Sequence, residues 1–121
     1  MKKLKFALIG AGGIANNAHA PAYEKMDNVE IAAVCDIIEE RAKKMADRLG
    51  APMYCTDYKK IFELDGLDAV DICTPNYLHS VIAVDALERG INVFCEKPDA
   101  VSVAEAEKMK AAAEKSGKTL M

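Results

Sequence analysis

The chain has 121 residues, of which 51% are hydrophobic, and its 16 basic and 19 acidic side chains give a net charge of −3. This length is typical of one domain, and the absence of a basic excess gives no reason to expect a nucleic-acid partner. The longest apolar runs, such as residues 6–9, are too short to cross a membrane, and no secretion signal follows the N-terminus. We therefore expect a globular cytoplasmic domain with no membrane contact.

Short apolar runs that have the length of buried strands recur along the chain. Each is bounded by Gly, Pro, Asn or Asp, which is typical of strands that end in turns. In chain order these runs cover residues 5–9, 29–35, 69–73 and 91–95, with a weaker run at 52–55.

Segments with the apolar spacing of helices separate these runs, and most carry a capping residue at the start or a glycine at the end. The first of these helices runs from Ile38 to Leu49 before Gly50, and the second, of one or two turns, is opened by Asp57. The third passes through Leu78, Ile82 and Ala86 before Gly90. The fourth runs from the capping box of Ser102 and Glu105 to Gly117.

Strands that alternate with helices at such short separations must pair in parallel, through right-handed crossovers. The sequence therefore predicts an α/β fold: one doubly wound parallel-sheet Rossmann domain over residues 1–121, with helices on both faces. Residues 118–121 read as the first residues of another strand. Because a domain rarely ends inside a strand, we expect this last strand to be truncated.

The four cysteines, Cys35, Cys55, Cys73 and Cys95, stand about twenty residues apart and form no C-x-x-C pair. Metal sites and disulfides both favour closer or paired spacing. Three of the four lie at or near the end of an apolar run, where a free cysteine behaves as a small buried hydrophobic residue. We expect reduced thiols, as in a cytoplasmic protein, and no metal site.

The first strand runs directly into a turn that matches the dinucleotide fingerprint G-x-G-x-x-A, with the residues Gly10, Ala11, Gly12, Gly13, Ile14 and Ala15. Gly10 permits the tight turn, Gly12 lets a diphosphate approach the backbone, and Ala15 lets the next helix lie close to the strand. The start of that helix offers unpaired N–H groups to phosphates. We therefore expect this turn to bind a dinucleotide.

Asp36 ends the second strand about 20 residues after the fingerprint, where a carboxylate accepts hydrogen bonds from the hydroxyls of the adenosine ribose. A carboxylate there repels a 2′-phosphate, and Ile37 and Ile38 follow it in place of an arginine. The pattern predicts NAD rather than NADP as cofactor. The alternative is a glycine turn that serves only chain reversal, with Asp36 as a helix cap.

Two polar stretches follow later strands: Cys73-Thr74-Pro75-Asn76-Tyr77-Leu78-His79, and Cys95-Glu96-Lys97-Pro98. Both stand at the carboxyl ends of central strands, where open α/β sheets bind ligands. Together with the glycine turn, Asp36 and the segment His19-Ala20-Pro21-Ala22, they resemble the Gfo/Idh/MocA family of dehydrogenases, which includes glucose–fructose oxidoreductase and inositol dehydrogenase. The resemblance covers all 121 residues.

The resemblance implies a role for individual residues of these stretches. Lys97 would be the catalytic lysine, which hydrogen-bonds the substrate hydroxyl that is oxidised and also lies against the cofactor, and Pro98 would fix the shape of its turn. The residues on the ribose and nicotinamide side of the cofactor would be Thr74, Pro75, Asn76, His79 and Glu96.

A lysine suits a reaction in which a hydroxyl loses its proton while hydride passes to a nicotinamide ring. It can stabilise the developing alkoxide as a cation, or act as a base if burial lowers its pKa from about 10.4 towards neutrality. Without the family pattern, Lys97 would be interpreted as a solvated loop residue and His79 as a residue that flanks its helix.

Members of the family are longer than this chain and carry a second, α+β domain with the substrate pocket, the main oligomer interface and usually a catalytic histidine. We therefore expect the nucleotide-binding domain of an NAD(P)-dependent oxidoreductase that acts on the CH–OH group of a sugar, polyol or related small molecule. With the second domain absent, the chain would bind NAD without turnover. Its exposed surface and strand edge would allow self-association.

Three other functions fit the same residues. The chain could be a complete, non-catalytic module that binds NAD, or the cofactor domain of a relative that uses tightly held NAD to cleave glycosidic bonds. It could also be an α/β domain that binds no nucleotide.

Overall fold

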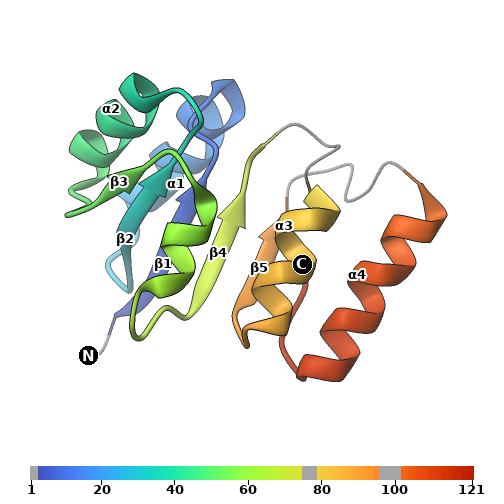
Figure 1. Ribbon diagram of the computed structural model, residues 1–121. Coiled ribbons are helices and arrows are strands. Elements are labelled where there is room, and N and C mark those ends of the chain that lie inside the picture. The colour runs from blue at the N-terminus through green and yellow to red at the C-terminus, as the bar shows by residue number, and fades with distance from the viewer. Residues whose placement is uncertain (1–2, 75–78, 96–101) are drawn as a thin grey trace.

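Parallel strands form the centre of the computed structural model, which describes residues 3–74, 79–95 and 102–121. Within these residues one five-stranded sheet has the order β3-β2-β1-β4-β5, and all neighbouring strands are parallel (Figure 1). The predicted parallel fold is confirmed, although the third strand is shorter than expected. The strands are β1 (Leu4–Ile9), β2 (Val29–Cys35), β3 (Tyr54–Cys55), β4 (Ala69–Ile72) and β5 (Asn92–Cys95).

Helices cover both faces of the sheet, and α3 packs against β4 and β5 with α4 beside it (Figure 1). In chain order the helical elements are the π-helix η1 (Ala15–His19), α1 (Ala20–Glu24), α2 (Glu39–Leu49), the 3-10 helix η2 (Tyr58–Glu63), α3 (His79–Glu88) and α4 (Val103–Ser116).

The end signals that the sequence predicts for these helices are present. The side chains of Asp57 and Ser102 accept hydrogen bonds from backbone N–H groups in the first turns of η2 and α4. Gly50 and Gly117 adopt the left-handed conformation that ends α2 and α4. Local sequence therefore sets the limits of these elements.

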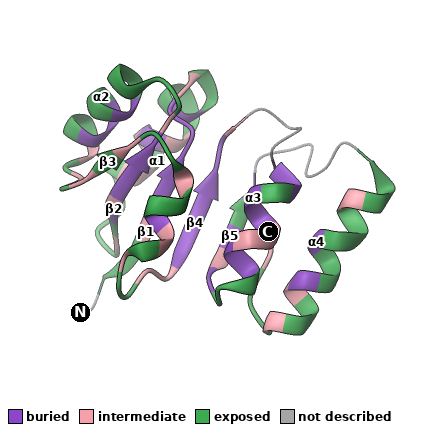
Figure 2. Ribbon diagram, in the orientation of Figure 1, coloured by how far each residue is buried: buried purple, intermediate pink, exposed green. Residues whose placement is uncertain are grey.

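Two hydrophobic cores lie on opposite faces of the sheet, and successive residues of β1 alternate between them. Ala7 and Ile9 pack towards the core that includes η2, α3 and α4, whereas Leu8 packs towards the core that includes η1, α1 and α2. The central strands are therefore buried on both faces, as Figure 2 shows. Burial on both faces explains why their sequences are apolar runs rather than alternating patterns.

The segment after the glycine turn differs from the regular helix that the sequence predicts. The Ala20 N–H donates to the carbonyl of Ala15, five residues back, which is the pattern of a π-helix. Pro21 follows, and its ring has no N–H and would clash with the carbonyl four residues earlier in a regular α-helix. The wider turn accommodates Pro21, which lies in the first turn of α1.

The last residues of the chain pair with β5 on its outer side. Leu120 forms a parallel bridge to Val93, and the Met121 N–H donates to the Val93 carbonyl over 2.9 Å. The Cys95 N–H in turn donates to the Met121 carbonyl over 2.8 Å. The predicted start of a further strand is confirmed. Among the described residues, no helix is both long enough and apolar enough to span a bilayer.

The backbone at Gly10 has no room for a side chain, because the end of β4 lies directly against it. Gly10 has a φ of +99°, and a Cβ there would lie 2.7 Å from the Cys73 carbonyl carbon and 2.9 Å from the Thr74 nitrogen. We predict that Gly10→Ala lowers the free energy of unfolding by about 2 kcal/mol or more, because both strain and backbone overlap oppose it.

Urea denaturation of the two proteins measures this loss. Gly13→Ala is the matched control: a Cβ at Gly13 meets no heavy atom of the described chain within 4 Å, so the midpoint should stay near that of the parent. Equal stabilities of Gly10→Ala and the parent would contradict the prediction.

Candidate cofactor-binding site

A cavity of about 660 Å³ opens at the carboxyl ends of the strands. Gly10 and Gly12 line it from the turn after β1, Asp36 from the end of β2, and Thr74 from the end of β4. The chain order of the strands reverses between β1 and β4, and open α/β sheets bind ligands in the crevice at that point. The structure thus brings together the predicted residues of three separate segments.

The glycine turn is tied to the neighbouring strand by its first two amides. The Gly10 N–H donates to the Cys35 carbonyl over 2.7 Å, and the Ala11 N–H donates to Asp36 Oδ2 over 2.8 Å. Ala15 is fully buried under the turn, whereas Gly13 and Ile14 lie at the surface. Of the four amides at residues 10–13, two are therefore engaged inside the protein, and those of Gly12 and Gly13 lie next along the turn.

Asp36 is held in place by three hydrogen bonds. Besides the bond from Ala11, its Oδ1 accepts from the Ile38 N–H over 2.8 Å, and its own N–H donates to the Cys55 carbonyl over 3.1 Å. Each carboxylate oxygen has a second lone pair, so both can still accept from a ligand. The alternative role of Asp36 as a cap is part of this arrangement, because the same carboxylate bonds at the start of α2 and at the glycine turn.

Arg41 also lines the cavity, although it belongs to none of the sequence motifs. It lies in the first turns of α2, and its Nη1 is 4.0 Å from the position that a Cβ on Gly12 would take. A guanidinium at this distance from the glycine turn adds positive charge to the cavity. The sequence signal for Arg41 was its position five residues after Asp36. Only the structure, in which α2 begins at Glu39, shows that the Arg41 side chain points back towards the glycine turn.

Thr74 carries a buried hydroxyl oxygen that has no hydrogen-bond partner among the described residues. Its carbonyl lies 2.7 Å from Nε2 of His79, the buried first residue of α3. Buried polar atoms are nearly always hydrogen-bonded, so an orphaned hydroxyl at the wall of a cavity indicates a position for a polar ligand atom.

The remaining predicted site residues lie outside the part of the chain that the structure describes. They are Pro75 and Asn76 of the first polar stretch, and Glu96 and Lys97, with Pro98, of the second. The strands that lead to them, β4 and β5, are adjacent and in register from Ala69 and Asn92 onwards.

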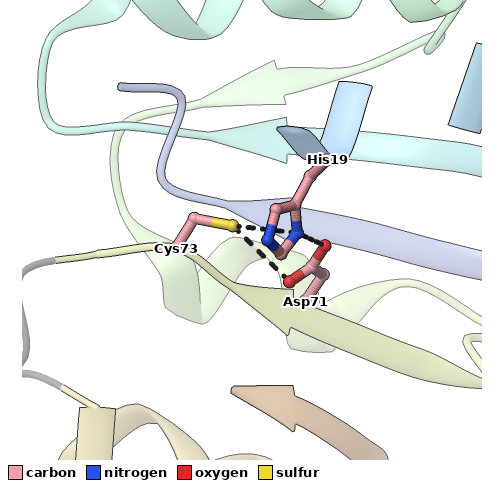
Figure 3. A group of neighbouring side chains, drawn as sticks. All are labelled: His19, Asp71 and Cys73. Carbon is pink, nitrogen blue, oxygen red and sulfur yellow. Dashed lines mark hydrogen bonds and ion pairs between the residues drawn. The ribbon is translucent and has the colours of Figure 1, made fainter. Parts of the chain in front are cut away.

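A cluster of titratable side chains lies between η1 and β4, close to the glycine turn. His19 Nδ1 is 2.5 Å from Asp71 Oδ2, and Cys73 Sγ is 3.4 Å from the same nitrogen. Figure 3 shows how the three side chains point toward one another. Tyr23 donates its hydroxyl to Asp71 Oδ2 over 2.6 Å. Asp71 is only 1% exposed, so these donors compensate a charge that would otherwise be costly to bury.

His19, Asp71 and Cys73 are also side chains of metal-binding types, and their donor atoms lie within 4.8 Å of one another. Two ligands bound to one tetrahedral ion at about 2.1 Å would stand about 3.4 Å apart. His19 and Asp71 are closer than that. Their separation is that of a hydrogen bond, which accounts for the cluster.

Burial and the adjacent Asp71 carboxylate raise the pKa of Tyr23 well above its ordinary value of 10.0. Both causes disfavour the phenolate, so the hydroxyl stays protonated and keeps its hydrogen bond to Asp71. Tyr23 thereby links α1 to the central strand β4.

Comparison with known proteins decides the family. The sequence profile of the Gfo/Idh/MocA oxidoreductases, described as an oxidoreductase family with an NAD-binding Rossmann fold, matches residues 4–121. The chain belongs to the Gfo/Idh/MocA family.

Two curated relatives of the Gfo/Idh/MocA chain illustrate its extent. It is 36% identical over 117 residues to D-glucoside 3-dehydrogenase of Escherichia coli strain K12, which covers 97% of this chain and 33% of that protein. It is 33% identical over 120 residues to inositol 2-dehydrogenase of Salmonella paratyphi B, covering 98% and 35%. The chain thus spans about a third of the length of these curated relatives.

Solved structures agree with the fold. The WlbA dehydrogenase of Chromobacterium violaceum, in complex with NADH and UDP-GlcNAcA, matches with a TM-score of 0.94 and 35% identity over 100% of this chain and 35% of that one. KijD10, a 3-ketoreductase of Actinomadura kijaniata in complex with TDP-benzene and NADP, matches with a TM-score of 0.92 and 31% sequence identity. This match covers 99% of the present chain and 38% of KijD10. The resemblance predicted from the sequence is confirmed. Of these two neighbours, the first holds NADH and the second NADP.

The Tyr23 hydroxyl generates a prediction about pH. Because the pKa of Tyr23 is raised in the folded protein, the folded form keeps this proton at a pH where the unfolded chain loses it. The stability that the protonated Tyr23 hydroxyl contributes is complete below pH 10 and is lost as the pH rises above 10. We predict that the parent loses stability more steeply than Tyr23→Phe between pH 9 and pH 11, although it is the more stable of the two at pH 7 by about 1 kcal/mol.

Urea denaturation at each pH measures the two slopes. Tyr54→Phe is the control, since Tyr54 is exposed on β3 and its replacement should leave the steep loss intact. Parallel curves for the parent and Tyr23→Phe would contradict the buried hydrogen bond.

Proposed function

We propose that the chain binds NAD in the cavity between β1, β2 and β4, as the cofactor half of a dehydrogenase that oxidises a CH–OH group. The single observation that carries this proposal is the convergence of the glycine turn, the fixed Asp36 carboxylate and the orphaned Thr74 hydroxyl on one cavity. Membership of a family of nicotinamide-dependent oxidoreductases supports it.

The diphosphate would lie against the amides of Gly12 and Gly13. The amides of Gly10 and Ala11 already have acceptors within the protein, so those of Gly12 and Gly13 would be the ones that bind the phosphates. The absence of a Cβ at Gly12 permits close approach, and Arg41 beside it supplies the positive charge that two phosphates favour.

The adenosine ribose would be bound by Asp36. Its two oxygens are fixed by Ala11 and Ile38, so the lone pairs that remain have a defined direction towards the ribose hydroxyls. Ile37, 84% exposed beside the carboxylate, provides an apolar surface for the adenine ring. A 2′-phosphate at this position would meet the Asp36 charge, which favours NAD over NADP, although Arg41 reduces that penalty.

The nicotinamide half would lie along the polar stretches after β4 and β5. The Thr74 hydroxyl would donate to or accept from it, and Pro75, Asn76, His79 and Glu96 would complete that wall by family resemblance. When bound, the nicotinamide accepts a hydride. Lys97 would hydrogen-bond the substrate hydroxyl that loses its proton.

The substrate class we propose is a sugar, a polyol or a related small molecule, since the curated relatives carry the names of sugar and polyol dehydrogenases. Cytoplasmic location fits the four cysteine thiols, three of them buried. A second copy of the chain is a further proposed partner, through the sheet edge where Phe94 and Met121 are exposed.

The Asp36 assignment predicts a change in cofactor preference. Asp36→Ala should lower the affinity for NAD about tenfold or more, because hydrogen bonds from the ribose hydroxyls to the charged carboxylate are lost. The affinity for NADP should fall much less. Calorimetric titration of both cofactors measures the ratio, in which any general loss of stability cancels.

Asp47→Ala is the matched control for this titration. Asp47 is an exposed aspartate of α2 that pairs with Lys43, and its removal should change neither affinity. Equal losses for NAD and NADP in Asp36→Ala would contradict the ribose role of Asp36.

The length of the chain predicts its catalytic behaviour. A substrate must be held on both sides to place its carbon against the nicotinamide, and the chain spans only about a third of its relatives. We expect the 121-residue chain to bind NAD but to give no steady NAD reduction with a panel of polyols and aldoses. Absorbance of NADH at saturating NAD measures this, with binding confirmed in the same sample. Sustained turnover would contradict the prediction.

A further inference from the structure

Two cysteines that are far apart in the sequence are neighbours in the sheet. Cys35 and Cys55 are register partners in the parallel pairing of β2 with β3, and both are free thiols. Neighbouring strands are about 4.8 Å apart, which is within the range of Cα separations of about 4.4–6.8 Å found in disulfides. Cys35 belongs to the core on one face of the sheet and Cys55 packs against the same core, so their side chains point to the same side of the sheet.

The pair combines one accessible thiol with one buried thiol. Cys55 is only partly buried, whereas Cys35 is 3% exposed and lines the cavity. Because β3 has only two residues and lies at the edge of the sheet, it can move the short distance that brings two Cβ atoms to the separation of about 3.8 Å found in a disulfide.

The backbone of the same two residues supports the cofactor cavity. The Cys35 carbonyl accepts the hydrogen bond from the Gly10 N–H, and the Cys55 carbonyl accepts the one from the Asp36 N–H. Asp36 in turn binds Ala11 in the glycine turn. A covalent bond between Cys35 and Cys55 would therefore act on the backbone that supports both the turn and the carboxylate.

We propose that Cys35 and Cys55 form a reversible disulfide with each other when they react with a low-molecular-weight disulfide. We further propose that this Cys35–Cys55 bond lowers the affinity of the cavity for NAD. The first half concerns only the two thiols, while the second rests on the proposed function. Binding groups must be held within about 0.5 Å of their productive geometry, so a movement of β3 towards β2 is large enough to weaken binding.

The reaction with a small disulfide RSSR proceeds in two exchanges. The Cys55 thiolate attacks one sulfur of RSSR, a protein–S–S–R bond forms, and RS⁻ leaves. The Cys35 thiolate then attacks the Cys55 sulfur, the Cys35–Cys55 bond forms, and a second RS⁻ leaves. The two protons of the cysteine thiols pass through solvent to the two RS⁻ ions, so the protein is oxidised by two electrons and RSSR is reduced to two RSH.

Burial raises the pKa of both thiols, that of Cys35 with a further contribution from Cys55. Since the thiolate is the reacting form, the exchange is slow at neutral pH and becomes faster as the pH rises. The rate of bond formation should therefore increase between pH 7 and pH 9.

The test treats the purified chain with oxidised glutathione at pH 8.5 and measures its intact mass. We expect a loss of about 2 Da without an added glutathione, and a peptide map that joins Cys35 to Cys55. Calorimetric titration should then give an NAD affinity at least about tenfold lower than before treatment, restored by dithiothreitol.

Two variants control the experiment. Cys55→Ser should show neither the mass loss nor any change in NAD affinity on treatment. Cys95→Ala, which removes a buried cysteine of β5 and keeps the pair, should behave as the parent does.

Each other outcome decides against part of the proposal. A stable glutathione adduct on Cys55, or a reduced protein after treatment, overturns the disulfide. A Cys35–Cys55 bond with unchanged NAD affinity overturns its effect on the cavity. A bond that forms in a chain that binds NAD in neither state supports the disulfide and contradicts the proposed function instead.

Discussion

The structure depends on the place where the end of β1 meets the ends of β2 and β4. At Gly10 the backbone donates to the Cys35 carbonyl on one side and lies against the Cys73 carbonyl on the other, with no space for a side chain. This contact allows β1 to turn at the level at which its neighbours end. Three strand ends meet at the cavity, and each provides a different group. These groups are the backbone amides after β1, the Asp36 carboxylate after β2 and the Thr74 hydroxyl after β4.

Much of this arrangement was predictable because its causes are local. Apolar runs bounded by turn residues predicted the strands, and Asp57, Ser102, Gly50 and Gly117 set the ends of helices through their own backbone or side chains. The parallel order then follows from the short crossovers. The same reasoning placed Gly10, Asp36 and Thr74 at one edge of the sheet, since parallel strands end together.

The contacts that the sequence could not predict join residues whose separation is set by strand register. Nothing local relates His19 to Asp71, 52 residues later, or Cys35 to Cys55. Cys35 and Cys55 are about twenty residues apart along the chain, whereas the β2–β3 pairing makes the two residues adjacent. Pro21 was a local signal for the π-helix η1. The contact of the His19 side chain with Asp71, in contrast, depends on the tertiary fold.

The two glycines of the fingerprint have separable physical roles. Gly10 is required by the protein itself, because its N–H, its positive φ and its contact with β4 are all internal. At Gly12 the protein leaves space: a Cβ would come no closer than 4.0 Å to the Arg41 side chain, so the described residues themselves do not require glycine there. A turn that served only chain reversal would need the first glycine and not the second. The open space at Gly12, in a cavity that Arg41 and Asp36 also line, is therefore the feature on which the proposed binding role of the turn depends.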